Sequence, residues 1–305
     1  MRNRKGFTLV EMMIAIVILA IAVAGITTAF QSQVTSFSTQ EAVTTAQTTG
    51  ALVIMKLAED IRMAGYGIPK DSTDGTTEAI RAVVNNDNTA GNSDSVTIRY
   101  CLGPSGYFMG TLSVANPSLT INIPGGSAFD TNTPVKVLNL RREDLFPGNA
   151  ITASGAADNN VLLSGIASTA VPFDLGVFVG ANTSNIRYFI AGAGTDNVAL
   201  MREITPVGGA AQAPEVVAFG VEDVQFAYGL DPNGGGVNSY VNAPTAAERR
   251  QVLAVRINVI LRSDKKDEGT IFGTVRAEDG PTRGGDGKRR RIFSTTVRLR
   301  NARVI

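Results

Sequence analysis

The chain has 305 residues, with 28 Lys/Arg and 27 Asp/Glu, so its formal net charge is only +1. It contains no histidine, which removes the usual general base and the commonest metal ligand. Its single cysteine, Cys101, excludes an intramolecular disulfide, so a folded domain must be stabilised by core packing alone. The length is sufficient for one large domain or two small ones.

The N-terminal stretch combines a short basic segment with a long apolar run. Three basic residues lie before Gly6, and the run 7–30 then contains one charge, Glu11, with no other charge until Glu41. An uncharged apolar run of about 20 residues is long enough to cross a bilayer as a helix. The basic flank predicts a cytoplasmic N-terminus and export of the remainder. Glu11 needs a partner, because an acid costs about 2–3 kcal/mol at the bilayer centre on insertion scales.

Two simpler interpretations compete for this segment. The residues Ala22-Val23-Ala24 are typical of a signal-peptide cleavage site, and the run also suits a plain membrane anchor. A charge in the fifth position of the apolar run is atypical of both, because that part of a signal or anchor is normally its most hydrophobic.

The helix predicted for this run continues beyond the membrane segment. The first proline is Pro69, and Gly65 and Gly67 supply C-terminal caps, so we expect one helix from residue 7 to about 64. Gly50 weakens it locally. Its second half should present an apolar stripe to a globular domain. The residues expected in that stripe are Val34, Phe37, Val43, Ala46, Leu52, Val53, Leu57, Ile61 and Ala64.

After Pro69 the pattern changes to short β-like runs separated by Gly, Asn, Asp and Pro. In 255–259 apolar and polar residues alternate, as in a half-buried antiparallel strand. Between about 102 and 215 the predicted strands are weaker, which indicates a β-rich insertion. The predicted strands are Ser95–Cys101, Leu119–Ile123, Val135–Leu140, Asn185–Ala191, Val198–Ile204, Val221–Tyr228, Val252–Arg262 and Ile292–Arg300.

Two groups of polar residues could indicate a functional site, a pair of catalytic carboxylates and a calcium loop, but the sequence disfavours both. Glu59 and Asp60 are adjacent on the predicted helix and point about 100° apart, so they cannot flank one substrate bond; we expect a solvated helix face. The segment 231–236, Asp-Pro-Asn-Gly-Gly-Gly, begins like a calcium loop but lacks the closing acid. We expect a turn there.

Positive charge is concentrated near the C-terminus. Residues 249–305 hold 15 Lys/Arg against 6 Asp/Glu, a net charge of +9, whereas residues 1–248 carry a net charge of −8. The run Lys288-Arg289-Arg290-Arg291 supports a nucleic-acid hypothesis, although Phe293 is the one nearby aromatic residue that could stack on a base. We favour the alternative that these cations solubilise the last strands or contact an acidic patch of a neighbouring subunit.

The ordered residues Gly6, Phe7 and Glu11 resemble the class III signal of type IV prepilins position by position. The resemblance implies that prepilin peptidase cleaves between Gly6 and Phe7 and methylates the new amine of Phe7. It also implies that Glu11 pairs with the N-terminal ammonium of a neighbouring subunit. Two unit charges about 4 Å apart attract by about 4 kcal/mol at an effective dielectric constant of 20, which offsets the cost of the acid.

A second resemblance, to PilW-type minor pilins, rests on five blocks in the same order. It implies an α+β fold, with a long N-terminal helix packed on a mainly antiparallel sheet. Its divisions would be a leader at 1–6, a transmembrane half-helix at 7–30, an amphipathic half at 31–66 and a β-rich periplasmic domain at 67–305. J-type minor pseudopilins of type II secretion share much of this outline. The blocks are 59–66, 93–100, 221–231, 252–263 and 293–301.

The resemblance implies a structural subunit of type IV pilus assembly or initiation, without catalysis or a cofactor. Its partners would be prepilin peptidase, other minor pilins, the major pilin, the inner membrane and a large adhesin at the pilus tip. The protein would first lie in the inner membrane and then in the pilus at the cell surface. A minor pseudopilin of a type II secretion system and a DNA-binding pilin for DNA uptake are the alternative functions.

Overall fold

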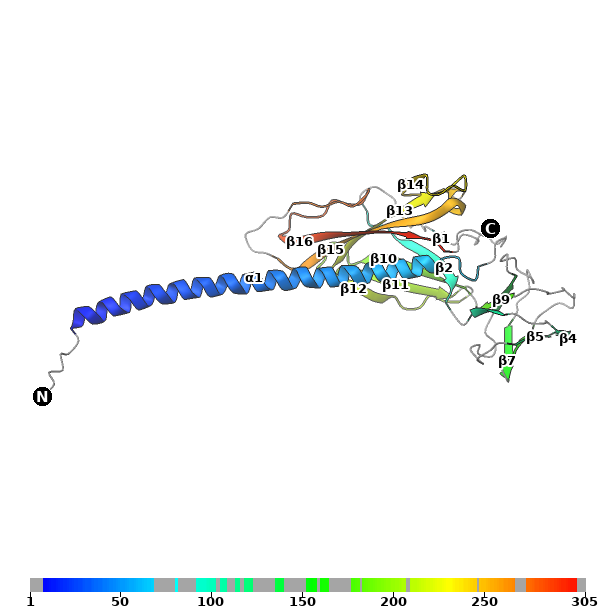
Figure 1. The fold of residues 1–305 in the computed structure, drawn as a ribbon, viewed down its shortest axis with the longest axis horizontal. Helices are drawn as coiled ribbons and strands as arrows, with labels where there is room; N and C mark the ends of the chain where they lie inside the picture. Colours follow the sequence, from blue (N-terminus) through cyan, green and yellow to red (C-terminus); the bar gives the residue numbers. More distant parts are fainter. Residues whose placement is uncertain are drawn as a thin grey trace. The chain divides into compact units, whose positions relative to one another are not determined.

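The computed structural model forms two units, residues 1–48 and 49–305 (Figure 1). Gly6 and Phe7, which carry the predicted cleavage site, lie outside the described residues. The structure describes residues 8–68, 80–81, 92–102, 105–108, 113–115, 118–122, 135–139, 152–157, 160–164, 177–181, 183–206, 209–245, 247–266 and 273–300.

One helix, α1 (Leu9–Met63), accounts for the N-terminal part of the chain. Its end is as predicted: Gly65 and Gly67 adopt φ values of +80° and +70° after the last turn, which contains Arg62. A positive φ is strained for residues with a Cβ, so glycine ends the helix at low cost. The continuous helix predicted from the absence of proline is therefore confirmed.

In the first unit, the side chains of residues 8–37 are exposed. The helix is long and apolar enough to cross a membrane. Val34 and Phe37, which we expected in the apolar stripe facing a globular domain, are 51% and 68% exposed, so that part of the prediction is wrong.

In the second unit, α1 buries a narrow face. Val53, Leu57 and Ile61 are almost completely buried, whereas Leu52 is 60% exposed, contrary to our prediction. Gly50 is also buried, and a Cβ at this position would lie 2.5 Å from the ring of Phe293. The glycine therefore lets the helix backbone approach an aromatic side chain, which explains a residue that is otherwise unfavourable within a helix.

Two antiparallel sheets form the main part of the second unit. The α+β fold class predicted from the sequence is confirmed, and all eight predicted strands overlap observed ones. The five-stranded sheet has the order β1 (Ile80–Arg81), β2 (Val96–Cys101), β10 (Thr183–Ala191), β11 (Ala199–Pro206) and β12 (Glu215–Phe219). The four-stranded sheet has the order β14 (Ser239–Val241), β13 (Val221–Leu230), β15 (Val252–Lys266) and β16 (Lys288–Arg298).

The core lies between α1 and the two sheets. Alternation in β15 places Val255, Ile257 and Val259 in this core, as the sequence pattern predicted. Strands β10 and β11 approach β13, so both sheets and the helix share one cluster of buried apolar side chains. A short 3₁₀ helix, Glu248–Gln251, precedes β15.

The range 102–215, predicted as a β-rich insertion, contains two smaller antiparallel sheets. It also contains β10 and β11, which pair with each other and, through β10, with β2 of the five-stranded sheet. One small sheet has the order β3 (Ser105–Phe108), β9 (Val177–Ala181) and β6 (Val135–Leu138); the other has the order β4 (Ser113–Ala115), β5 (Ser118–Asn122), β8 (Asn160–Ser164) and β7 (Thr152–Ala157).

Candidate functional site

The first turn of α1 is closed by a reciprocal pair of side chains. The backbone N–H of Thr8 donates to Glu11 Oε2 at 2.9 Å, and its hydroxyl donates to the same oxygen at 3.1 Å. The N–H of Glu11 donates in turn to Thr8 Oγ1 at 3.3 Å. This is a capping box, whose signal, Thr-x-x-Glu, was present in the sequence but was not part of our prediction for Glu11.

The capping box gives Glu11 hydrogen bonds but no opposite charge. Both donors of Thr8 are neutral, and no ion pair joins Glu11 to a cation among residues 8–68. The side chain is exposed in the single chain. Residues 8–68 therefore supply no cation to compensate this carboxylate, and an uncompensated charge would be costly in lipid.

The predicted basic run lies at the start of β16, within the strand rather than before it. β16 pairs with β15 in antiparallel register, with Arg290 opposite Arg262 and Arg291 opposite Leu261. Because successive side chains of a strand point to opposite faces, Lys288 and Arg290 lie on one side and Arg289 and Arg291 on the other.

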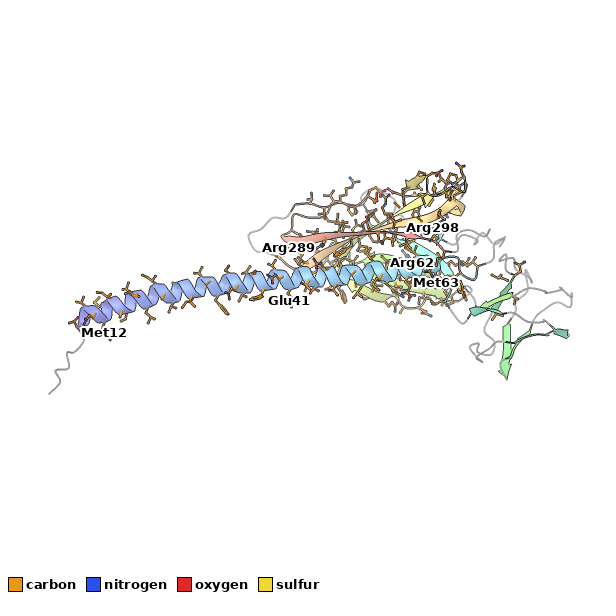
Figure 2. All side chains as sticks on the ribbon, viewed as in Figure 1. Met12, Glu41, Arg62, Met63, Arg289 and Arg298 are labelled. Atoms are coloured by element: carbon orange, nitrogen blue, oxygen red, sulfur yellow. The ribbon has the colours of Figure 1, made fainter. Side chains whose placement is uncertain are left out.

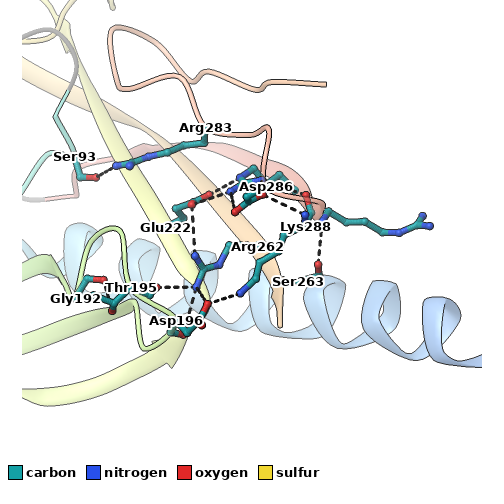
Figure 3. A network of polar contacts seen from close by, with 12 residues as sticks. Ser93, Gly192, Thr195, Asp196, Glu222, Arg262, Ser263, Arg283, Asp286 and Lys288 are labelled. Carbon is teal, nitrogen blue, oxygen red and sulfur yellow. Dashed lines mark hydrogen bonds and ion pairs between the residues drawn. The ribbon is translucent and has the colours of Figure 1, made fainter. Parts of the chain in front are cut away.

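Lys288 and Arg290 are committed to ion pairs within the domain. Lys288 Nζ lies 2.7 Å from Asp196 Oδ1, and only 5% of its side chain is exposed (Figure 3). Arg290 donates to both oxygens of Glu222, at 2.6 and 3.0 Å, and to both oxygens of Asp286, at 2.6 and 2.8 Å. Its side chain is 4% exposed. The structure thus removes both residues from the surface that we predicted for a partner or for nucleic acid.

Electrostatics explain why these buried cations are tolerated. Arg262 completes the cluster, with NH1 3.8 Å from Glu222 Oε1, so three cations meet three carboxylates. The hydrogen bond from Arg290 is the main cause that lowers the pKa of Asp286 well below its ordinary value. Asp196 is 86% exposed, so only the pairs of Glu222 with Arg290 and Arg262 are buried on both sides. A pair buried in this way is costly to break from one side, by about 3–5 kcal/mol.

Arg289 and Arg291 occupy the other face of β16. Arg291 is exposed, and its guanidinium lies 5.7 Å from the centroid of the Phe293 ring. Arg298, near the other end of the strand, is exposed as well, but alternation places it on the face of Lys288 and Arg290; Figure 2 labels Arg289 and Arg298 on β16. The N–H of Arg289 donates to Ser263 Oγ, which fixes its backbone on β15. Of the four cations in the run 288–291, only Arg291 is fully exposed, so the cationic surface contains fewer residues than the sequence predicted.

A buried polar cluster around Asp60 was missed by the sequence prediction. Asp60 is 3% exposed, so the solvated helix face that we expected is wrong for this residue, although Glu59 is exposed. Asp60 Oδ1 accepts a hydrogen bond from the Tyr100 hydroxyl at 2.9 Å. Its Oδ2 accepts from the Tyr188 hydroxyl at 2.5 Å and from Arg202 Nε at 3.1 Å.

These contacts connect α1 to the middle strands of the five-stranded sheet, because Tyr100, Tyr188 and Arg202 belong to β2, β10 and β11. Burial, followed by the charge of Asp60, raises the pKa of both tyrosines, so their hydroxyls remain donors. The arrangement fixes the helix on the sheet, because its donors converge on one carboxylate. We assign it a structural role, because Tyr100, Tyr188 and Arg202 all donate to Asp60 within the domain.

The turn after β13 has the predicted form. The carboxylate of Asp231 accepts hydrogen bonds from the N–H groups of Gly234 and Gly236, at 2.8 and 3.1 Å. Both of its oxygens thus accept from the backbone of the segment, which confirms the predicted turn.

Two known families match the chain, one at its N-terminus and one in its C-terminal part. Residues 1–27 match the prokaryotic N-terminal methylation motif, which includes Gly6, Phe7 and Glu11. Residues 187–301 match the family of type IV pilus-assembly protein W, from within β10 to beyond the end of β16. The chain matches no curated protein and no solved structure. Together, the matches over residues 1–27 and 187–301 support a PilW-like type IV minor pilin.

Proposed function

We propose that this pilin is a structural, non-catalytic subunit of the initiation or tip complex of a type IV pilus. In this proposal α1 holds the protein in the inner membrane, with the N-terminus cytoplasmic and residues 67–305 periplasmic, before assembly into the filament. The exposed apolar surface of residues 8–37 carries the proposal, because it requires lipid or the helices of neighbouring subunits as its surroundings.

Processing between Gly6 and Phe7 is the first step of this function. A peptidase at the membrane surface needs a close approach to the backbone, so Gly6→Leu should block cleavage, whereas Arg2→Ala, within the same leader, should permit it. Intact mass and N-terminal sequencing measure the result. A mature chain that begins at Met1, or after Ala24 as for a secretory signal, would contradict the proposal.

Docking through Glu11 is the second step. The capping box supplies only neutral donors to its carboxylate, whereas the methylated amine of Phe7 on a neighbouring subunit would supply a positive charge. Recruitment into the filament would then replace an uncompensated charge in lipid with an ion pair.

The capping box also provides variants that separate charge from helix capping. Glu11→Gln retains an oxygen that can accept from Thr8 but has no charge, and Thr8→Ala removes the hydroxyl but retains the carboxylate. If the charge docks the subunit, Glu11→Gln should be lost from sheared pili as completely as Glu11→Ala, and Thr8→Ala should still enter them. All three should remain in the membrane fraction.

The opposite result, in which Glu11→Gln is found in sheared pili and Thr8→Ala is not, would refute docking by charge. If Glu11→Gln enters pili like the wild type and Thr8→Ala does not, the contribution of Glu11 is to cap α1. Glu11→Asp should be intermediate, because it retains the charge with one methylene less reach.

The exposed cations of β16 are a second contact that we propose, with acidic surfaces of other minor pilins or the major pilin. The supporting observation is that Arg291 and Arg298 are both exposed and take no part in the internal ion pairs of Lys288 and Arg290. Alternation places them on opposite faces of β16, which is an edge strand of its sheet, so the proposed contact is with this edge. Arg291→Glu with Arg298→Glu should reduce co-purification at low salt, and less so at high salt. Arg62→Glu, an exposed cation on α1, is the control. Equal co-purification of the wild type and the double variant would contradict this proposed contact.

The alternatives have separate tests. The family description names type IV pilus assembly, which favours a pilus over a type II secretion system, and the presence of the protein in sheared pili would decide between them. DNA binding is disfavoured because two of the four cations in the basic run are paired internally. If the purified protein binds duplex DNA in a salt-dependent way and Arg291→Glu reduces that binding, the result would favour the DNA-binding alternative.

A further inference from the structure

The segment 273–287, which precedes β16, contacts β13 and β15 of the sheet β14-β13-β15-β16 on the face away from the core; we call it the strap. Its backbone hydrogen bonds join its own residues: Val275 and Arg283 exchange two at 2.8 Å, and the N–H of Gly280 donates to the carbonyl of Ala277 at 2.9 Å. The strap is therefore a hairpin with its own turn at 277–280.

The strap covers polar side chains of β13. Asp223 and Gln225 are 0% and 1% exposed, and they lie on the opposite face of β13 from the core residues Val224 and Phe226. A Cβ on Gly280 would lie 2.5 Å from Gln225 Nε2 and 2.7 Å from Asp223 Oδ2. The backbone of the strap thus rests directly on these two side chains.

The closed position is strained at one residue. Glu278 has φ +46°, the one positive φ of a non-glycine residue within the described ranges. It is the first central residue of the turn, where a positive φ usually selects glycine. Glu278 Oε1 accepts hydrogen bonds from Arg256 NH1 and Asn258 Nδ2, both at 3.1 Å. These two contacts with β15 offset the strain and hold the tip of the strap on the sheet.

Hydrogen bonding beneath the strap is incomplete. Asp223 Oδ2 and Gln225 Oε1 are buried, and no hydrogen-bond partner reaches them among the residues that the structure describes. Burial is the main cause that raises the pKa of Asp223. Because water would satisfy both oxygens, opening the strap recovers hydrogen bonds that the closed position lacks.

We infer that the strap opens as a unit while both sheets stay folded, and that Glu278 is the latch that keeps it closed. The strain and the unsatisfied oxygens favour opening. The contacts of Glu278 with Arg256 and Asn258 oppose it at the tip, and the hydrogen bonds of Asp286 with Arg290 hold the strap where it joins β16. Opening exposes the carboxylate of Asp223 and withdraws the guanidinium of Arg283 from Ser93, to which it donates at 3.3 Å (Figure 3). The outer face of the sheet thus has a second, more acidic state.

Hydrogen–deuterium exchange of the full-length protein in detergent tests this inference. Peptides from the strap should exchange at least about 100-fold faster than those from β13 and β15, and their exchange should respond little to low concentrations of urea, because local opening exposes little surface. Equal rates and equal urea dependence in the strap and in β15 would overturn the inference, since the strap would then open only when the domain unfolds.

Two matched variants test the latch. Glu278→Ala should increase exchange in the strap by about tenfold and leave β13, β15 and α1 unchanged, because it removes contacts that exist only in the closed position. Glu59→Ala, which removes an exposed carboxylate from α1, should change neither region. If Glu278→Ala leaves exchange in the strap unaltered, or accelerates exchange in strap and strands alike, Glu278 is not its latch.

Discussion

Asp60→Ala is the substitution for which the structure makes the strongest prediction. The carboxylate of Asp60 accepts hydrogen bonds from Tyr100, Tyr188 and Arg202, and none of these three groups is exposed. Removing it leaves two phenol hydroxyls and a buried guanidinium without their common acceptor. The helix also loses its polar contact with the five-stranded sheet.

The size of the effect follows from what remains of the ion pair. Breaking a buried pair from one side costs about 3–5 kcal/mol. Arg202 keeps a second partner, because its NH1 lies 2.8 Å from Glu215 Oε1, whose side chain is 60% exposed. We therefore expect the lower end of this range, a loss of about 3 kcal/mol in the free energy of unfolding. With a urea m-value of about 3 kcal/mol/M the midpoint falls by about 1 M.

Urea denaturation of the detergent-solubilised protein, followed by tyrosine fluorescence and circular dichroism, measures this loss. Glu59→Ala is the matched control, since Glu59 is the preceding residue and its side chain is 70% exposed at 3.6 Å from Lys56. Exposed pairs of this type contribute less than about 1 kcal/mol. If Asp60→Ala and Glu59→Ala unfold within about 1 kcal/mol of each other, Asp60 does not fix the helix on the sheet.

The same cluster predicts a loss of stability at alkaline pH. Burial and then Asp60 raise the pKa of Tyr100 and Tyr188 above the ordinary value of 10.0 in the folded state. The unfolded chain therefore releases these protons at lower pH than the folded chain, so stability is fully present below about pH 10 and is lost as pH rises beyond it. Tyr188→Phe should reduce the slope of stability against pH in this range. An unchanged slope would contradict the assignment.

Two further predictions concern packing and the basic run. Gly50→Ala should destabilise the domain by about 1–2 kcal/mol despite the higher helix propensity of alanine, because its Cβ meets the Phe293 ring; Gly25→Ala, with no atom within 4 Å of its Cβ, should not. Thermal unfolding of both variants measures the difference. Arg290→Ala should cost about 3 kcal/mol or more because it leaves Glu222 and Asp286 without their shared cation, whereas Arg291→Ala should change stability by less than about 0.5 kcal/mol. Similar urea midpoints for the two arginine variants would show that the ion pairs of Arg290 add no stability.

Much of the fold was predictable because its signals are local. The absence of proline before Pro69 and the glycines after residue 64 determine one uninterrupted helix and its end. Period-2 alternation predicted β15, including the inward side chains of Val255 and Ile257. The residues that match the N-terminal methylation motif are also contiguous, so the sequence alone identified them.

The start of β16 was predicted too late in the chain. We expected the strand to begin at Ile292, and it begins at Lys288. A run of four cations is typical of a solvated loop, because each charge would be costly to bury without a partner. The partners of Lys288 and Arg290 are Asp196 and Glu222, which lie 92 and 68 positions away in the chain. No local pattern indicates such a pairing.

Asp60 shows the same division between local and tertiary information. Its helical position and its neighbour Glu59 are evident from the sequence, and both residues have the same type of side chain. The helix rotates them about 100° apart, so only one of them faces the sheet. Which one is buried depends on where Tyr100, Tyr188 and Arg202 lie once β2, β10 and β11 have paired. A charge can be buried only where such donors converge, and that convergence exists only in the folded domain.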